Sequence, residues 1–106
     1  MERAVIVYTT WPSIVEAEAA GRSIVEQRLA ACVNILPGMT AHYWWEGKIE
    51  RAEEAVMLVK TRASLAERVG AAVKALHSYT TPSVMVLAVG SADPAYQAWI
   101  VQETGG

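Results

Sequence analysis

The side chains best suited to hold a transition metal are few and widely spaced along the chain. They are one cysteine, Cys32, and two histidines, His42 and His77. Thiolate sulfur suits Cu(I), and a neutral imidazole nitrogen binds Cu or Zn. A closed site takes about four such ligands, so one chain cannot build it from these three residues. We therefore predict no required cofactor, and a weakly bound copper or other divalent ion with His77 and Cys32 as candidate ligands.

Both candidate ligands also have an ordinary structural interpretation. His77 follows a predicted helix, where an imidazole can hydrogen bond to the last carbonyl groups and is favoured by the helix dipole. Cys32 begins a predicted core strand, where a cysteine packs as a small apolar side chain. A metal site would then be shared between chains or completed by carboxylates of the acidic segment 50–54. Both interpretations stay open at this level.

A second candidate site combines one lysine with aromatic residues. Lys60 lies at the inner end of a predicted strand, where it could bind an anion in a cleft between subunits. The other residues of this candidate cleft are Tyr43, Trp45 and Tyr79. The alternative is a structural ion pair, although Glu54, on the same strand face, lies far along the strand from Lys60.

These residues are positioned by one long predicted hairpin. Its arms are residues 32–45, interrupted at Pro37-Gly38, and residues 48–61, with Gly47 supplying the positive φ of a tight turn. Both arms exceed the usual strand of roughly 5–6 residues, so the hairpin should overhang the domain. A bulge is expected at the proline, which cannot donate to the ladder. Trp44 and Trp45 point to opposite strand faces, so we expect another copy of the chain to cover the tip.

The rest of the chain predicts a small α+β domain around this hairpin. Ser13 with Glu16, and Ser64 with Glu67, are predicted capping boxes that begin two helices. The predicted order is a strand over residues 4–10, a helix from 14 to about 30, the hairpin, a helix over 65–76, a strand over 84–89 and a helix from Pro94. The strands over 4–10 and 84–89 are continuously apolar, which is typical of strands buried on both faces. Two helices on one face of a four-stranded antiparallel sheet form a ferredoxin-like βαββαβ sandwich.

Composition limits the possible partners. The chain has 106 residues, which we interpret as one domain over residues 1–106. Nine basic residues stand against 11 acidic ones, and no basic run appears, which argues against nucleic-acid binding. The first apolar run is too short for a signal or a membrane span, and a lone cysteine fits a reducing compartment. We therefore predict a cytoplasmic protein with no membrane partner.

Several motifs together resemble the CutA (CutA1) family of divalent-cation tolerance proteins. They are Leu-Ala-Ala-Cys-Val-Asn at 29–34, Pro-Gly at 37–38, Tyr-Trp-Trp-Glu-Gly-Lys-Ile at 43–49, Leu-Val-Lys-Thr at 58–61, His-x-Tyr-x-x-Pro at 77–82 and Tyr-x-x-Trp at 96–99. The resemblance implies a ferredoxin-like fold similar to PII signalling proteins. It also implies a tight homotrimer, with hairpins packed around a threefold axis, and a link to copper and other divalent metals.

Three positions depart from the family pattern. Ser78 stands where a proline is common, and Thr9 and Leu76 stand where some metal-binding members have a cysteine and a histidine. We predict a homotrimeric, CutA-like protein that acts in divalent-metal (copper) tolerance through metal ion binding. The predicted trimer interface is the hairpin tip, Tyr43, Trp44 and Trp45. The alternative is a PII-like trimer that senses a small ligand or anion, or scaffolds a partner, without a metal role.

Two other classes share the predicted strand and helix order. An RNA-recognition module needs an aromatic RNP1 motif and a basic sheet, which this chain lacks. An acylphosphatase needs an arginine at a phosphate loop, and no such loop is evident. The chain also has no HExxH, no P-loop and no GxGxxG motif, so we predict that it is not an enzyme.

Overall fold

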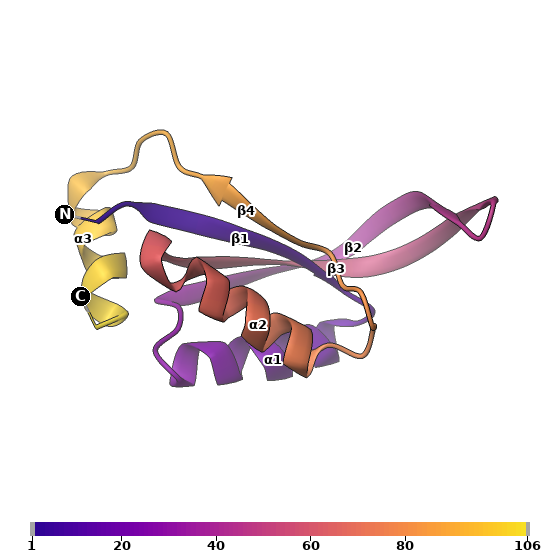
Figure 1. Cartoon of the computed structure of the whole chain (residues 1–106), viewed down its shortest axis with the longest axis horizontal. Helices are drawn as coiled ribbons and strands as arrows, with labels where there is room; N and C mark the ends of the chain where they lie inside the picture. The colour runs from indigo at the N-terminus through magenta and orange to yellow at the C-terminus, as the bar shows by residue number, and fades with distance from the viewer. Residues whose placement is uncertain (1, 106) are drawn as a thin grey trace.

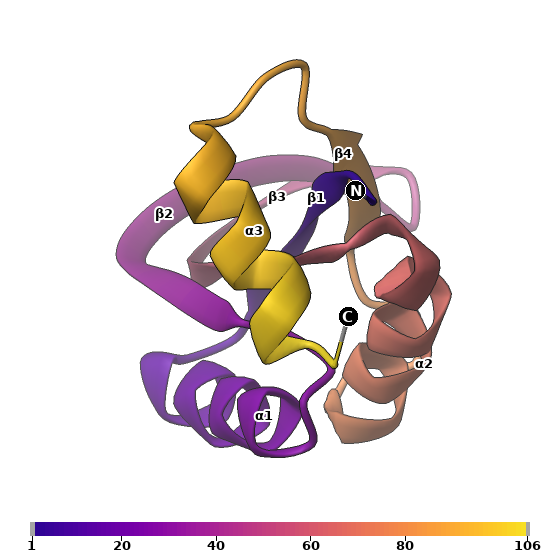
Figure 2. The ribbon, with the colours of Figure 1, turned by 90° about the vertical axis from the view of Figure 1, so that its left-hand side faces the viewer.

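One antiparallel sheet carries the other elements of the protein. In the computed structural model, which describes residues 2–105, its strand order is β2-β3-β1-β4. The elements are β1 (Ala4–Trp11), α1 (Ile14–Glu26), β2 (Cys32–Trp45), β3 (Lys48–Arg62), a 3-10 turn (Ala63–Leu65), α2 (Ala66–Leu76), β4 (Val84–Ala88) and α3 (Pro94–Glu103). Helices α1 and α2 lie side by side on one face of the sheet, and α3 crosses one end of it (Figures 1 and 2). The predicted ferredoxin-like arrangement is confirmed.

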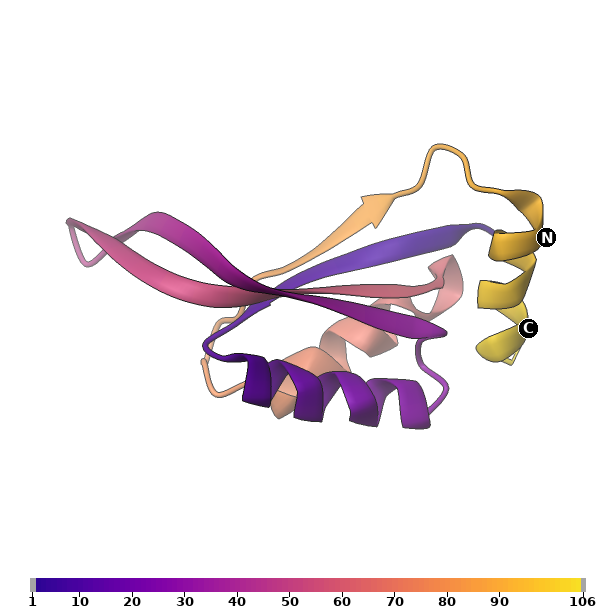
Figure 3. The same cartoon turned by 180° about the vertical axis from the view of Figure 1, so that it is seen from behind.

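The long hairpin is confirmed, with the bulge where the proline predicts it. Strand β2 pairs with β3 from Cys32 opposite Lys60 to Trp45 opposite Lys48, and the register shifts between Leu36 and Met39. Gly38 takes a φ of 73° inside that shift. At the tip, Glu46 and Gly47 both have positive φ, which is the pattern of a type I′ turn. The hairpin extends beyond the helices (Figure 3), and the longest dimension of the molecule is 45 Å.

The hydrophobic core lies between the sheet and the two helices that cover it. Its fully buried members include Val7, Trp11, Ile24, Met57, Val59, Val69 and Val73. Helix α1 approaches the sheet closely at Gly21, where an added Cβ would lie 2.8 Å from both Met57 Sδ and Val33 Cγ2. A larger residue there would force the Met57 and Val33 side chains, or the helix itself, to shift.

The opposite face of the sheet, which we call the bare face, stays largely uncovered. Cross-strand pairing puts Met85 with Tyr8 and Leu87 with Ile6 on this face, and Met85 is 61% exposed. The expectation that the strand over 84–89 is buried on both faces is therefore wrong for a single chain. Strand β4 is an edge strand, and within residues 2–105 the helices α1 and α2 cover the other face. Its apolar side chains Met85, Val86 and Leu87 are therefore exposed in the single chain.

One predicted helix start is wrong and the other is half formed. Ser13 Oγ accepts from the Glu16 N–H at 3.2 Å, but the Glu16 carboxylate accepts from Ser78, at 3.0 Å from its hydroxyl. Ser64 does not cap α2, because the chain enters that helix through a 3-10 turn and the Ser64 N–H donates to the Glu2 carboxylate. Helix α1 ends at Glu26, short of the predicted end. Among the described residues, no helix has the length and apolarity to cross a membrane.

We predict that Gly21→Ala lowers the free energy of unfolding by about 1–3 kcal/mol, because the new methyl group overpacks the core against Met57 and Val33. The matched control is Gly70→Ala in α2, where the added Cβ meets Val84 Cγ1 at an ordinary 3.7 Å. That variant should gain about 0.5–1 kcal/mol from helix propensity. Urea denaturation of both variants makes the comparison. Equal effects would show that Gly21 does not mark a close helix–sheet contact.

Candidate functional site

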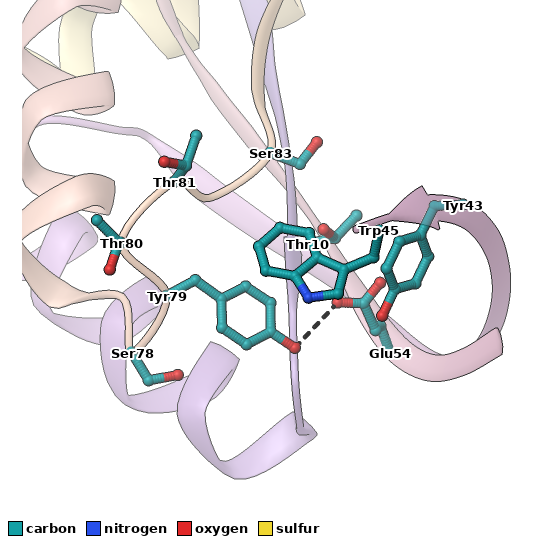
Figure 4. A pocket seen from close by; sticks show the side chains of 9 residues that line it. All are labelled: Thr10, Tyr43, Trp45, Glu54, Ser78, Tyr79, Thr80, Thr81 and Ser83. Carbon is teal, nitrogen blue, oxygen red and sulfur yellow. Dashed lines mark hydrogen bonds between the residues drawn. The ribbon is translucent and has the colours of Figure 1, made fainter. Parts of the chain in front are cut away.

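A cavity of about 630 Å³ lies between the hairpin and the loop that follows α2. Its lining residues are Thr10 from β1, Tyr43, Trp45 and Glu54 from the hairpin, and Ser78, Tyr79, Thr80, Thr81 and Ser83 from the loop (Figure 4). This volume falls within the roughly 300–1,000 Å³ typical of small-molecule sites. The cavity is therefore the candidate functional site of the chain.

The bulge decides which aromatic side chains face this cavity. Before it, Leu36 pairs with Val56 on the bare face, and after it Met39 pairs with Glu54. Both Val56 and Glu54 are on the same face of β3, because side chains alternate along a strand. On β2 the extra residue changes the alternation from even to odd positions, so Tyr43 and Trp45 join the Glu54 face. Without the bulge, their neighbour Trp44 would occupy that face instead.

The loop supplies the other wall of the cavity, and His77 holds it in place. His77 Nε2 lies 2.7 Å from the Thr10 carbonyl oxygen, and Nδ1 accepts from the Tyr79 N–H at 3.0 Å. Because Nδ1 accepts, the uncharged ring carries its proton on Nε2 and donates it to Thr10. The imidazole is buried and stacks on Trp11 with 4.2 Å between ring centroids. His77 therefore ties the start of the loop to β1 and orients Tyr79.

The predicted metal ligands are not brought together. Cys32 lies opposite Lys60 at the far end of the hairpin, with its Sγ 3.8 Å from the Tyr96 hydroxyl. His42 is exposed on the hairpin, opposite Arg51. Within residues 2–105, no group of three or more His, Cys, Asp or Glu side chains is arranged to hold a metal ion. In this conformation a metal at His77 would have to displace one of its two hydrogen bonds.

Three of the four predicted cleft residues meet, and Lys60 lies elsewhere. Tyr43, Trp45 and Tyr79 line the cavity together. Lys60 Nζ instead donates to the Tyr96 hydroxyl of α3 at 3.1 Å, and this hydrogen bond raises the pKa of Lys60. The ammonium group of Lys60 therefore contacts the Tyr96 hydroxyl and does not line the cavity. A different charged side chain lines it.

That group is Glu54, whose role sequence reasoning missed. The Tyr79 hydroxyl lies 3.4 Å from Glu54 Oε2 (Figure 4). Burial raises the pKa of Tyr79, and the charge and hydrogen bond of Glu54 raise it further. The sequence did contain a signal for this position of Glu54. Counting the alternation of side chains along β2 across the bulge at Pro37-Gly38 puts Tyr43 and Trp45 on the same face of the hairpin as Glu54. The loop hydroxyl groups, which also line the cavity, carry no such signal.

The arrangement is suited to binding. Aromatic rings, hydroxyl groups and one carboxylate line the space, which is the kind of lining that small-molecule sites have. Trp44, on the other face of the hairpin, is 73% exposed, so the predicted tip residues divide between the cavity and the outer surface.

Comparison with known proteins shows similarity over nearly the whole chain. The family model described as CutA1 divalent ion tolerance protein matches residues 5–103. The divalent-cation tolerance protein CutA of Archaeoglobus fulgidus is 45% identical over 94 residues, covering 89% of this chain and 91% of that protein. The CutA protein of Thermus thermophilus is 39% identical over 105 residues, covering 99% of this chain and all of its own length, 100%.

Solved structures agree with the sequence matches. The crystal structure of the divalent ion tolerance protein CutA1 from Ehrlichia chaffeensis superposes with a TM-score of 0.95 at 27% identity, covering 100% of this chain and 99% of that one. An Archaeoglobus fulgidus structure, described as a periplasmic divalent cation tolerance protein CutA, has a TM-score of 0.92 at 42% identity, covering 95% of this chain and 98% of its own.

We predict that His77→Ala lowers the free energy of unfolding by about 2–4 kcal/mol, because it leaves the Thr10 carbonyl and the Tyr79 N–H without partners and opens space beside Trp11. The control is His42→Ala, whose side chain is exposed and whose effect should stay within about 0.5 kcal/mol. Urea denaturation measures both, and nitrogen NMR of the ring reports the Nε2–H tautomer. An Nδ1–H tautomer would contradict the hydrogen bond from Tyr79.

Proposed function

This chain belongs to the CutA1 divalent ion tolerance family, and we propose that it acts in the tolerance of copper and other divalent metals as a non-catalytic homotrimer of the cytoplasm. The single cysteine supports a reducing compartment for this chain. The Archaeoglobus fulgidus relative, by contrast, is described as periplasmic.

The observation that supports assembly is the bare face of the sheet. Leu36, Met85 and Leu87 are exposed there, and Tyr8 and Leu58 are only half-buried beside them. Strands β2 and β4 are also both edge strands, with unpaired backbone groups. In a cyclic assembly, an edge strand and the apolar bare face of each copy contact the next copy, so neither surface stays exposed. Contact through the hairpin tip, with Tyr43, Trp44 and Trp45, extends the same interface.

Weak metal binding is the second part of the proposal. The predicted ligands stay His77 and Cys32, helped by carboxylates or by donors of another copy. A metal on His77 Nδ1 competes with the Tyr79 N–H, which already donates to that nitrogen. This competition supports modest affinity, since breaking the bond offsets part of the free energy of binding. Copper is favoured over zinc at a nitrogen site by the Irving–Williams order.

A ligand-sensing trimer without a metal role is the second candidate function. The observation that favours it is the cavity, in which Tyr43, Trp45 and Tyr79 lie together. The two candidates differ in what the protein binds in the absence of metal. A chelator removes metal binding and leaves recognition of an organic ligand intact.

For assembly, we expect light scattering after gel filtration to give about three times the chain mass of 11.5 kDa. Met85→Glu puts a charge on the bare face and should shift the mass toward that of a monomer, because a buried unpaired charge is costly. The control is Val15→Glu on the outer side of α1, where the side chain is 79% exposed. It should leave the mass unchanged. A monomeric wild-type protein would refute the trimer.

For metal binding, we expect calorimetry to detect modest Cu(II) binding. His77→Gln should reduce it, because glutamine removes the imidazole while keeping a donor near Thr10. His42→Gln is the matched control and should bind as the wild type does. Undiminished binding by the His77 variant removes His77 from the site. A wild type that binds no copper leaves the ligand-sensing trimer as the function.

A further inference from the structure

The charge of the cavity is opposite to that expected from the sequence. Glu54 is the acidic residue of its lining, and within residues 2–105 the lining includes no Lys, Arg or His. The contact of Glu54 with the Tyr79 hydroxyl is 3.4 Å, near the outer limit of hydrogen bonding, and Tyr79 is a neutral donor. The carboxylate therefore keeps most of its acceptor capacity. An anion placed here would meet a negative charge.

The aromatic residues strengthen this preference for positive charge. Tyr43, Trp45 and Tyr79 are all exposed although they line a cavity, and Trp45 is 61% exposed. The face of an aromatic ring carries partial negative charge and attracts cations, most strongly for tryptophan. In Figure 4, Tyr43 and Trp45 approach from the hairpin, and Tyr79 approaches from the loop with its hydroxyl directed to Glu54. Rings and carboxylate together make a partial cage for a cation.

The nature of the cation follows from the other lining groups. A hard metal ion such as Mg²⁺ or Ca²⁺ takes about six or more oxygen ligands, usually with several carboxylates, whereas this cavity offers one. The space is also far larger than a bare ion requires. An ammonium group could pair with Glu54, while the rings contact an apolar body attached to it.

We propose that the cavity binds a small organic cation, an ammonium group carried on an apolar or aromatic body, with Glu54 recognising the charge and Tyr43, Trp45 and Tyr79 forming the cage. One chain supplies every one of these groups, so the inference goes beyond metal tolerance and does not depend on copper. The cavity borders the bare face, and a neighbouring copy would add a wall to a site whose recognising groups are already complete.

Calorimetry at neutral pH, with a chelator present, tests this with three probes of similar size: benzylammonium, benzyl alcohol and benzoate. We expect saturable binding of benzylammonium, binding of benzyl alcohol about tenfold weaker, and no detectable binding of benzoate. Light scattering on the same samples reports assembly separately. A failure of the trimer or of copper binding thus stays distinct from a failure of this inference.

Variants of adjacent glutamates provide the decisive comparison. Glu54→Gln should weaken benzylammonium binding about tenfold and remove the preference over benzyl alcohol. Glu53→Gln removes the same charge from the opposite strand face, where Glu53 pairs with Arg51 at 3.3 Å, and should bind within about twofold of wild type. Glu54→Asp keeps the charge and should retain the preference for the cation, which shows that the site itself is intact.

Several results would overturn the inference. They are no benzylammonium binding by the wild type, equal binding of the alcohol or the benzoate, and equal losses in the Glu53 and Glu54 variants. The first would mean that the cavity does not recognise an organic cation. The last would mean that the net charge of the protein, and not the cavity, attracts the cation.

Discussion

The bulge at Pro37-Gly38 is the constraint on which both halves of the molecule depend. On one side of it, Val33 and Ile35 pack against the core; on the other, the hairpin overhangs the domain. The extra residue lets the same strand keep its apolar positions toward α1 and then turn Tyr43 and Trp45 toward Glu54. Gly38 meets the backbone requirement with positive φ, and Pro37 leaves no unused donor in the interrupted ladder.

Much of the fold could be predicted because local signals and tertiary packing agree. The two long arms of the hairpin, the proline bulge and the tight turn all appear in the structure. The environment of β4 could not be predicted, because an apolar run looks the same whether a helix or another copy covers it. The Ser64 capping pattern failed for a related reason. Its N–H has a partner from the N-terminal segment, the Glu2 carboxylate, which no short-range pattern contains.

The candidate site was predictable in its aromatic part but not in its charge. Tyr43, Trp45 and Tyr79, predicted for a cleft between subunits, line one cavity within a single chain. Lys60 and Glu54 lie on the same face of β3 but at different ends of it. Lys60 lies at the end near α3, where it contacts Tyr96, and Glu54 lies at the hairpin end, where it contacts Tyr79. From the sequence alone, His77 is a candidate metal ligand because an imidazole nitrogen can donate a lone pair to a metal. In the structure both ring nitrogens form hydrogen bonds that hold the loop. A residue type suited to metal binding is here also the residue that orients Tyr79.

The proposed assembly and the proposed ligand recognition both depend on where the bulge places each side chain, and the register of β2 against β3 decides that placement. Cross-strand backbone NOEs in a labelled sample measure that register directly. We expect contacts that put Leu36 opposite Val56 and Met39 opposite Glu54, with two residues of β2 between these pairs and one of β3. Contacts that put Gly38 opposite Glu54 would contradict it, because Trp44 would then face the cavity in place of Tyr43 and Trp45.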